Sequence, residues 1–235
     1  MNKSEQLIYD KISTNFPKVN IQIKLNKHQV QIELDEIKMN CWKDEWEDKQ
    51  SIIIYRIKSL LGQNKRIHGR SCEIKLLDKN TADFFLNQHH IMGFAQSYYK
   101  LGLYKNDELL AIATFSKGRK MNRLPEGKKS FELIRFCNAS GITVVGGLSK
   151  LLKYFINLTD AGDIMTYIDK DHSEGKAFLK LGFKLHSVTI PIAFKVDKNS
   201  QKRMNKNIKI DDDEIHLVKN SGNLKLVYTP HHEEV

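Results

Sequence analysis

The side chains of this 235-residue sequence that could perform acid–base chemistry stand on two predicted strands. Asp169 directly follows the apolar run Ile164–Ile168, so we expect it at the carboxyl end of a strand, where it could accept a proton or a hydrogen bond. Arg135 alternates with Leu133 and Cys137, which predicts that the three share one face of an earlier strand. Each has a structural alternative: a turn-capping carboxylate for Asp169, and half of an ion pair for Arg135.

A glycine-containing segment lies between these two strands. It runs from Gly141 through Gly146-Gly147 to a predicted helix over residues 148–157. The start of a helix presents unpaired backbone N–H groups and the positive end of the helix dipole, and glycine lets phosphates approach the backbone. The segment matches neither the Walker nor the dinucleotide-binding glycine motif. It is a candidate for holding a pyrophosphate, with a simple tight turn as the alternative.

The histidines and cysteines do not indicate a metal site. His89 and His90 are adjacent, so their side chains diverge, and no carboxylate or further histidine stands at ligand spacing. A substrate-facing role in a loop or a structural role remains open for both. The three cysteines form no CxxC pair, so neither a disulfide framework nor a cysteine zinc site is predicted.

Basic residues gather in three places, one of them at Lys202, Arg203 and Lys206, and the formal net charge of +10 favours an acidic partner, with DNA as the first candidate. Residues 64–70 look like a basic linker. The loop over residues 116–129 carries six basic side chains against one acidic side chain. Such a loop could contact phosphates and position a duplex, or it could be a solvated lysine loop. Its basic residues are Lys117, Arg119, Lys120, Arg123, Lys128 and Lys129.

The elements that would position these residues begin at residue 71. Alternating and helical periodicities predict the order strand, helix, three strands, glycine loop, helix, strand, short helix and a last strand from Gly182. The predicted ranges are Cys72–Leu77, Asn80–Asn87, the hairpin Tyr98–Tyr104 and Glu108–Phe115, Phe131–Cys137, Leu148–Asn157, Ile164–Ile168 and Glu174–Leu181.

Smaller regions flank this core. Before it we expect a helix over 4–15, a hairpin of strands 19–25 and 30–34, and a helix over 44–61 that Gly62 ends. After it we expect a C-terminal β-hairpin of strands 214–218 and 224–228. The sequence therefore predicts an α/β (α+β) fold: a mixed central sheet flanked by helices in residues 71–193, an N-terminal α+β appendage in 1–70 and a C-terminal extension in 194–235.

The second half of the predicted core resembles a known superfamily. A strand ending at Asp169 is followed by Ala177-Phe-Leu-Lys-Leu-Gly-Phe183, a helix that ends in a Leu-Gly-Phe turn. This pattern, after a pyrophosphate loop, resembles the GNAT acyltransferases over residues 71–190, about half of the chain. The resemblance implies a GNAT-like sheet and acetyl-CoA or another acyl-CoA as the cofactor.

Within that superfamily the sequence looks most like the Mom DNA-modification proteins of bacteriophages. The matching residues are His89 and His90, Leu133-Ile-Arg-Phe136, Gly146-Gly-Leu-Ser-Lys150 and Asp169. The resemblance implies acyl transfer to the exocyclic amine of adenine in DNA, with Arg135 and Asp169 in the active site. It also implies that the CoA phosphates bind the segment that consists of Val144, Val145, Gly146, Gly147, Leu148 and Ser149.

One position departs from the GNAT pattern. Many members carry a tyrosine in the last helix that protonates the departing thiolate, and here that position is Phe178. The general acid would then be Tyr167, His172 or water. Two other functions stay open: an N-acetyltransferase acting on a small amine or a protein, and a catalytically inactive GNAT-fold module that binds DNA.

The sequence also bears on location. No apolar run approaches the roughly 20 residues that span a bilayer, and residues 1–4 lead into no apolar leader segment. We therefore expect a protein of the cytoplasm, in a bacterium or a phage-infected cell, that does not associate with membranes. The oligomeric state is left open.

Overall fold

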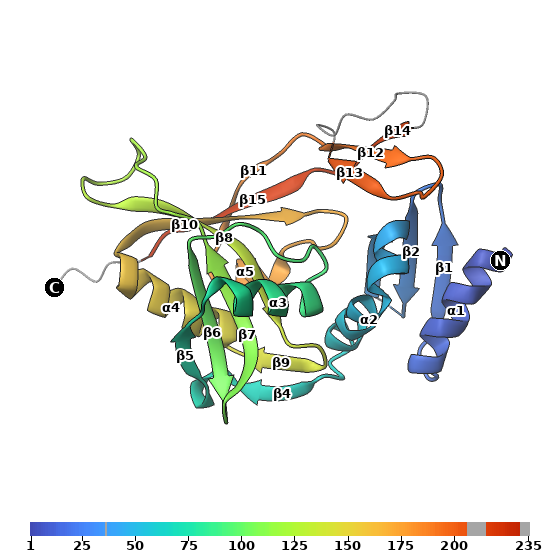
Figure 1. The fold of residues 1–235 in the computed structure, drawn as a ribbon, viewed down its shortest axis with the longest axis horizontal. Coiled ribbons are helices and arrows are strands. Elements are labelled where there is room, and N and C mark those ends of the chain that lie inside the picture. The colour runs from blue at the N-terminus through green and yellow to red at the C-terminus, as the bar shows by residue number, and fades with distance from the viewer. Residues whose placement is uncertain (36, 206–214, 231–235) are drawn as a thin grey trace. The chain divides into compact units, whose positions relative to one another are not determined.

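The computed structural model describes residues 1–35, 37–205 and 215–230. The chain forms two compact units (Figure 1). Unit 1 contains Met1–Ile54, Ile168–Glu174 and Val188–Leu224. Unit 2 contains Tyr55–Tyr167, Gly175–Ser187 and the described part of Lys225–Val235.

A seven-stranded sheet forms the centre of unit 2, in the order β11-β15-β10-β8-β7-β6-β5. Neighbours from β5 to β8 are antiparallel, whereas β10 runs parallel to β8. The predicted fold class, a mixed sheet flanked by helices, is therefore confirmed. The strands are β5 (Glu73–Leu76), β6 (Tyr99–Lys105), β7 (Glu108–Phe115), β8 (Lys129–Asn138), β10 (Ala161–Asp169), β11 (Lys184–Val188) and β15 (Asn223–Tyr228).

Helices α3 (Lys79–His89) and α4 (Gly147–Thr159) cover opposite faces of this sheet (Figure 1). Phe155 of α4 stacks on Phe115 of β7, with ring centroids 3.8 Å apart. On the other face, Phe85 of α3 belongs to a buried cluster with Ile112. Apolar residues at helical spacing thus meet alternate residues of the strands, which is why both helices were predictable. The short helix α5 (Lys176–Lys180) precedes β11.

The hairpin β6–β7 follows the sequence prediction closely. Its turn residues Asn106 and Asp107 both have positive φ, 50° and 59°. Such turns match the right-handed twist of the two strands, and Asn and Asp tolerate the left-handed conformation better than other side chains do.

A β-bulge in β8 corrects one expectation. Thr114 of β7 lies opposite Arg135 and Phe115 lies opposite Leu133, so Ile134 is an extra residue. Strict alternation would place Leu133 and Cys137 on one face together with Arg135. Because the bulge reverses the alternation, Leu133 shares the face of Phe115 and α4, whereas Cys137 packs against the α3 cluster.

Two segments expected to be irregular are strands. Residues 64–70, predicted as a basic linker, contain β4 (Lys65–His68) and a 3-10 turn (Gly69–Ser71). The predicted glycine loop contains β9 (Ile142–Val145), which pairs with β4 in parallel, Lys65 opposite Ile142 through His68 opposite Val145. Both strands have four residues, too short for alternation to identify, and their pairing joins residues 77 apart.

Unit 1 is built from segments that are distant in the sequence. Helix α1 (Lys3–Asn15) packs beside a sheet of β1 (Ile21–Leu25), β2 (Gln29–Leu34) and a third strand that was not predicted, β3 (Ile37–Trp42). A second sheet contains β12 (Ala193–Asp197), β13 (Arg203–Asn205) and β14 (Ile215–Lys219). Trp42 packs with Val196 and Val218 of this second sheet. Helix α2 (Lys43–Leu60) has a non-helical residue, Lys49, and continues into unit 2.

The predicted C-terminal hairpin is wrong. Strand β14 pairs with β12, whereas β15 lies between β11 and β10 in the large sheet. The residues of the glycine turn between them bond to other segments. The Lys170 N–H donates to Gly222 O, and the Thr189 N–H donates to Asn223 O. Alternation identified both strands, but two alternating strands joined by a glycine turn need not pair with each other.

The domain boundaries at residues 70 and 193 remain a prediction, because compactness does not test which segments fold independently. Among the described helices, none is long and apolar enough to cross a membrane.

Candidate functional site

The parallel pair β8–β10 opens towards its carboxyl end. Pairing runs from Lys129 opposite Ala161 to Glu132 opposite Met165. One residue further, the Thr166 hydroxyl donates to the Leu133 carbonyl at 2.9 Å. Both strands continue beyond this point, β8 to Asn138 and β10 to Asp169. The bulged residue Ile134 stands where the ladder ends. Carboxyl ends of parallel strands that diverge are where ligands bind in α/β sheets.

Helix α4 begins at the same end of the sheet. Its N-cap residue, Gly146, has φ of +73°, and a Cβ there would meet no atom within 4 Å. The first intrahelical bond is donated by the Lys150 N–H to Gly146 O at 3.0 Å, so the N–H groups of residues 147–149 precede it. Gly69 lies against the Gly147 nitrogen, which leaves Leu148 and Ser149 as the amides best placed to meet an anion.

Lys150 joins the predicted glycine loop to the predicted basic linker. Its ammonium donates to Gly69 O at 3.1 Å and to Cys72 O. A Cβ on Gly69 would lie 3.1 Å from both Gly147 N and Val145 O, so a side chain there would push the backbone before α4 away by a few tenths of an ångström. Lys150 belongs to the motif noted in the sequence, but its partners are about 80 residues earlier and no local pattern indicates them.

Arg135 faces the loop that follows α3. Its guanidinium donates to Gly93 O at 3.2 Å and to Ile134 O at 2.9 Å. Burial lowers the pKa of this guanidinium, and burial raises the pKa of the neighbouring Cys137 thiol to about 12. Arg135 thus fixes the backbone around the bulge, and its part in an active site remains a prediction.

His89 and His90 also make structural contacts. The Ser140 N–H donates to His89 Nδ1 at 3.2 Å, and the His89 ring lies edge-on to Phe85. Burial lowers the pKa of His89. His90 Nδ1 accepts from the Met92 N–H at 3.1 Å. Contact with a substrate stays a prediction for both.

The remaining predicted catalytic residues divide between the units. Asp169 and His172 belong to unit 1, whereas Tyr167 belongs to unit 2 and has 40% of its surface exposed. The Asp169 carboxylate accepts from the Asp171 N–H at 2.9 Å and from the Asn220 amide at 3.3 Å, which is the turn-capping alternative. Its role as a base remains a prediction.

His172 lies in a buried cluster of unit 1. Its Nε2 is 3.2 Å from the Glu45 carboxylate, and the side chains of both residues are 9% exposed. A residue with a buried carboxylate partner is poorly placed to donate a proton to a substrate, so among the predicted general acids Tyr167 is the more accessible.

Phe178, which replaces the expected tyrosine, lies in a row of aromatic rings. Its ring centroid is 5.4 Å from that of Phe183, which in turn is 5.4 Å from Tyr228 of β15. Tyr228 was not among the predicted site residues, because the C-terminal strand was expected to belong to a separate hairpin. Its phenol belongs to unit 2, as does that of Tyr167.

The basic loop over residues 116–128 is partly neutralised. Arg123 pairs with the buried Asp163, and Lys128 pairs with Asp160. Lys120 is exposed, and Lys117 and Arg119 line a groove of about 550 Å³. This groove extends to the bulge; its other lining residues are Gln96, Ser97, Tyr98, Ser116, Glu132 and Ile134.

Comparisons with known proteins give distant likenesses. No family model matches the chain, and no curated protein matches it. The solved ribosomal-protein-S18-alanine N-acetyltransferase from Escherichia coli is 11% identical over 70% of this chain and 98% of that chain, with a TM-score of 0.43.

Two further solved structures are similar to the same extent. Naa50 of Arabidopsis thaliana in complex with the bisubstrate analogue CoA-Ac-MVNAL is 14% identical over 68% of this chain and 99% of that chain, with a TM-score of 0.43. A GNAT family acetyltransferase from Elizabethkingia anophelis with acetyl-CoA bound is 12% identical over 68% and 99%, with a TM-score of 0.39. Values of this size do not place the chain in a family.

Proposed function

We propose that the chain is an acyl-CoA-dependent N-acyltransferase. The observation that carries the proposal is the end of the β8–β10 ladder at Met165 and Glu132, at the same sheet end as the start of α4. An elongated donor that has amide groups along one arm and a pyrophosphate at its end would need both features: open strand edges for the amides and helix N–H groups for the phosphates.

The residues at this place fit such a donor. Beyond Leu133 the edge of β8 that faces β10 no longer pairs with it. The space beside Gly146 is open, and the amides of Leu148 and Ser149 precede the first helical hydrogen bond. When bound, acyl-CoA would supply a thioester carbonyl that an amine can attack. Of the predicted cofactor residues, Val144 and Val145 act as strand residues that hold the glycines in place.

Transfer forms a bond from the amine nitrogen to the acyl carbon and breaks the carbon–sulfur bond. The amine loses one proton, and the departing thiolate gains one. With a phenylalanine at position 178, we assign the donated proton to an exposed phenol, Tyr167, with Tyr228 as the alternative. Arg135 would keep the bulge rigid, and Asp169 remains the proposed proton acceptor.

For the acceptor we propose an amine on a polyanion, the adenine exocyclic amine of DNA, as in the Mom proteins that the sequence resembles. Support comes from Lys117 and Arg119, whose charges have no carboxylate partner within 4 Å among the described residues. The groove also contains the Glu132 carboxylate. An acceptor that carries both an amine and phosphates would therefore meet a carboxylate for the amine and cations for the phosphates. A protein or small amine is the second candidate acceptor.

Two measurements test these proposals. Calorimetry with acetyl-CoA should show one site per chain, and the absence of heat at millimolar acetyl-CoA would overturn the acyltransferase. Mass analysis of plasmid nucleosides after co-expression should show an added acyl mass on deoxyadenosine. Acetyl-CoA binding with unmodified nucleosides would move the acceptor to a small amine or a protein.

A further inference from the structure

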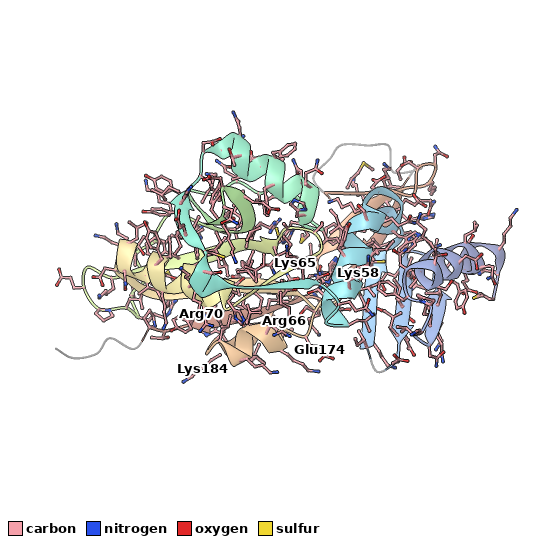
Figure 2. The ribbon with its side chains drawn as sticks, turned by 90° about the horizontal axis from the view of Figure 1, so that it is seen from below. Lys58, Lys65, Arg66, Arg70, Glu174 and Lys184 are labelled. Carbon is pink, nitrogen blue, oxygen red and sulfur yellow. The ribbon has the colours of Figure 1, made fainter. Side chains whose placement is uncertain are left out.

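A second basic groove lies on β4, outside the site described above. It encloses about 500 Å³ between β4, the 3-10 turn after it, and the turn of the β6–β7 hairpin. Figure 2 shows Lys65, Arg66 and Arg70 following one another along this segment. We call it the β4 groove; its charged and polar lining consists of Lys65, Arg66, His68, Arg70, Ser71, Lys105, Asn106 and Glu108.

The cations of the β4 groove are not neutralised. Lys65, Arg66, Arg70 and Lys105 are all exposed, and none has a carboxylate within 4 Å in the described part of the chain. Lys75, in contrast, lies 3.3 Å from Asp107 in the same hairpin turn. Four uncompensated charges in one concave surface, against the single carboxylate of Glu108, produce a local positive potential.

The backbone that carries these cations is held in place. Four consecutive residues of β4 pair with β9, and the Ser71 hydroxyl donates to His68 O at 2.8 Å. Gly69 directly follows β4, and its carbonyl accepts a hydrogen bond from the Lys150 ammonium. Charges on a fixed backbone bind an anion without the cost of ordering a loop, so this groove differs from a flexible lysine-rich loop.

We propose that the β4 groove binds the phosphate backbone of a nucleic acid. Four residues of a strand extend about 13 Å, long enough for about two consecutive phosphates of one strand. The groove lining contains no phenylalanine, tyrosine or tryptophan on which a base could stack. Contacts would therefore be made to phosphates and would not depend on base sequence.

The bound strand would lie near the proposed donor site, because β9 leads directly into Gly146 and α4. The inference rests on the proposed function in one respect: the bound nucleic acid would be the acceptor of the acyl group. Binding itself requires no thioester, so it can be measured separately from acyl transfer.

The test is fluorescence anisotropy with a labelled 20-base-pair DNA duplex at several salt concentrations. Neutralising the groove by the triple change Lys65→Gln, Arg66→Gln and Arg70→Gln should weaken binding at least about tenfold and lower the slope of log K against log salt by roughly 2 to 3. The matched control changes three exposed lysines of unit 1, Lys18→Gln, Lys24→Gln and Lys27→Gln, and so lowers the net charge equally. It should change affinity by less than about threefold.

Three results would overturn the inference: no duplex binding by the unchanged protein, equal losses in the two triple variants, or an unaltered affinity in the groove variant. Calorimetry of the groove variant with acetyl-CoA tests whether the groove binds the phosphates of the cofactor instead of those of a nucleic acid. If the variant loses acetyl-CoA and keeps DNA, the groove binds the cofactor, and the inference is wrong. The single change Lys105→Gln, on the hairpin side of the groove, gives the same test if the triple variant does not fold.

Discussion

His89 shows how a residue at a plausible site position can act through the fold instead. Its Nδ1 must be unprotonated to accept the Ser140 N–H, and burial lowers its pKa. The unfolded chain therefore binds a proton at this side chain at a higher pH than the folded chain does. The stability that His89 contributes is complete above about pH 6.5, the ordinary histidine pKa, and is lost as pH falls from there through the lower folded pKa.

We predict that His89→Gln flattens this pH dependence, because glutamine accepts the same hydrogen bond without titrating. Urea unfolding between pH 7.5 and 5 measures the free energy of unfolding of both proteins. His28 and His216, whose pKa values are also lowered, are present in both proteins, so the difference reports on His89. The control is His186→Gln, which changes an exposed histidine on β11. It should leave the dependence of the unfolding free energy on pH unchanged. A His89→Gln curve as steep as that of the unchanged protein would contradict the assignment.

Cys137 offers a second test at the scale of one residue. With a pKa of about 12, caused by burial, about one thiol in 10⁴ is ionised at pH 8. We predict that iodoacetamide alkylates Cys137 about a thousandfold more slowly than an ordinary exposed thiol. Peptide mass mapping follows each cysteine separately, and labelling in urea provides the control in which all three react. Rapid labelling of the folded protein at Cys137 would show that the α3 face of β8 is open to solvent.

Among the secondary-structure elements, the contact between α4 and the 3-10 turn after β4 brings together the basic segment and the proposed phosphate site. Lys150→Met would leave the carbonyls of Gly69 and Cys72 without this donor. We expect the free energy of unfolding to fall by about 1–3 kcal/mol. Acetyl-CoA affinity should fall as well, because the loop before α4 loses its support.

Lys153→Met is the matched control for that prediction, since Lys153 is exposed on the same helix. Its unfolding free energy should change by less than about 0.5 kcal/mol. If both variants unfold alike in urea, the bonds from Lys150 do not hold the turn after β4 to the helix, and the backbone of the β4 groove would be held by its pairing with β9 alone.

The sequence predicted the helices and strands better than it predicted which strands pair with one another. Periodicity found α3, α4 and the strands β5 to β8, and the Asn106-Asp107 turn identified the β6–β7 hairpin correctly. It could not show the bulge at Ile134, because one extra residue leaves the apolar pattern almost unchanged. Nor could it show β4 and β9, because four residues are too few for alternation to indicate a strand and only their pairing identifies them.

At the scale of the whole molecule, the same limit affected the candidate site. Motif spacing singled out Gly146, Lys150 and Arg135, and the structure gives each a definite structural setting. Asp169 and His172 were chosen from the same stretch of sequence as Tyr167, yet they belong to the other compact unit. Which unit a residue joins depends on contacts made by the described residues of 1–54 and 188–224, and no local pattern near position 169 encodes those contacts.

Unit 1 illustrates how such distant segments are joined. The Arg203 guanidinium donates to Asp44 at 2.9 Å and to Glu45 at 2.7 Å, and it lies 4.5 Å from the centre of the Trp42 ring. Glu45 also lies beside His172, so one buried cluster connects residues from all three segments of the unit. Buried carboxylates that lose a cation are strongly destabilising, whereas exposed pairs contribute little.

Arg203→Met should therefore lower the free energy of unfolding by about 3–5 kcal/mol, because it leaves the buried Glu45 and the half-buried Asp44 without the guanidinium. Lys202→Met removes the adjacent pair with Asp48, whose side chains are 52% and 49% exposed, and should cost less than about 1 kcal/mol. Urea unfolding followed by tryptophan fluorescence reports on this region directly, since Trp42 lies under the guanidinium. Equal losses in the two variants would show that the cluster does not hold the three segments together, and unit 1 would then depend on its apolar contacts alone.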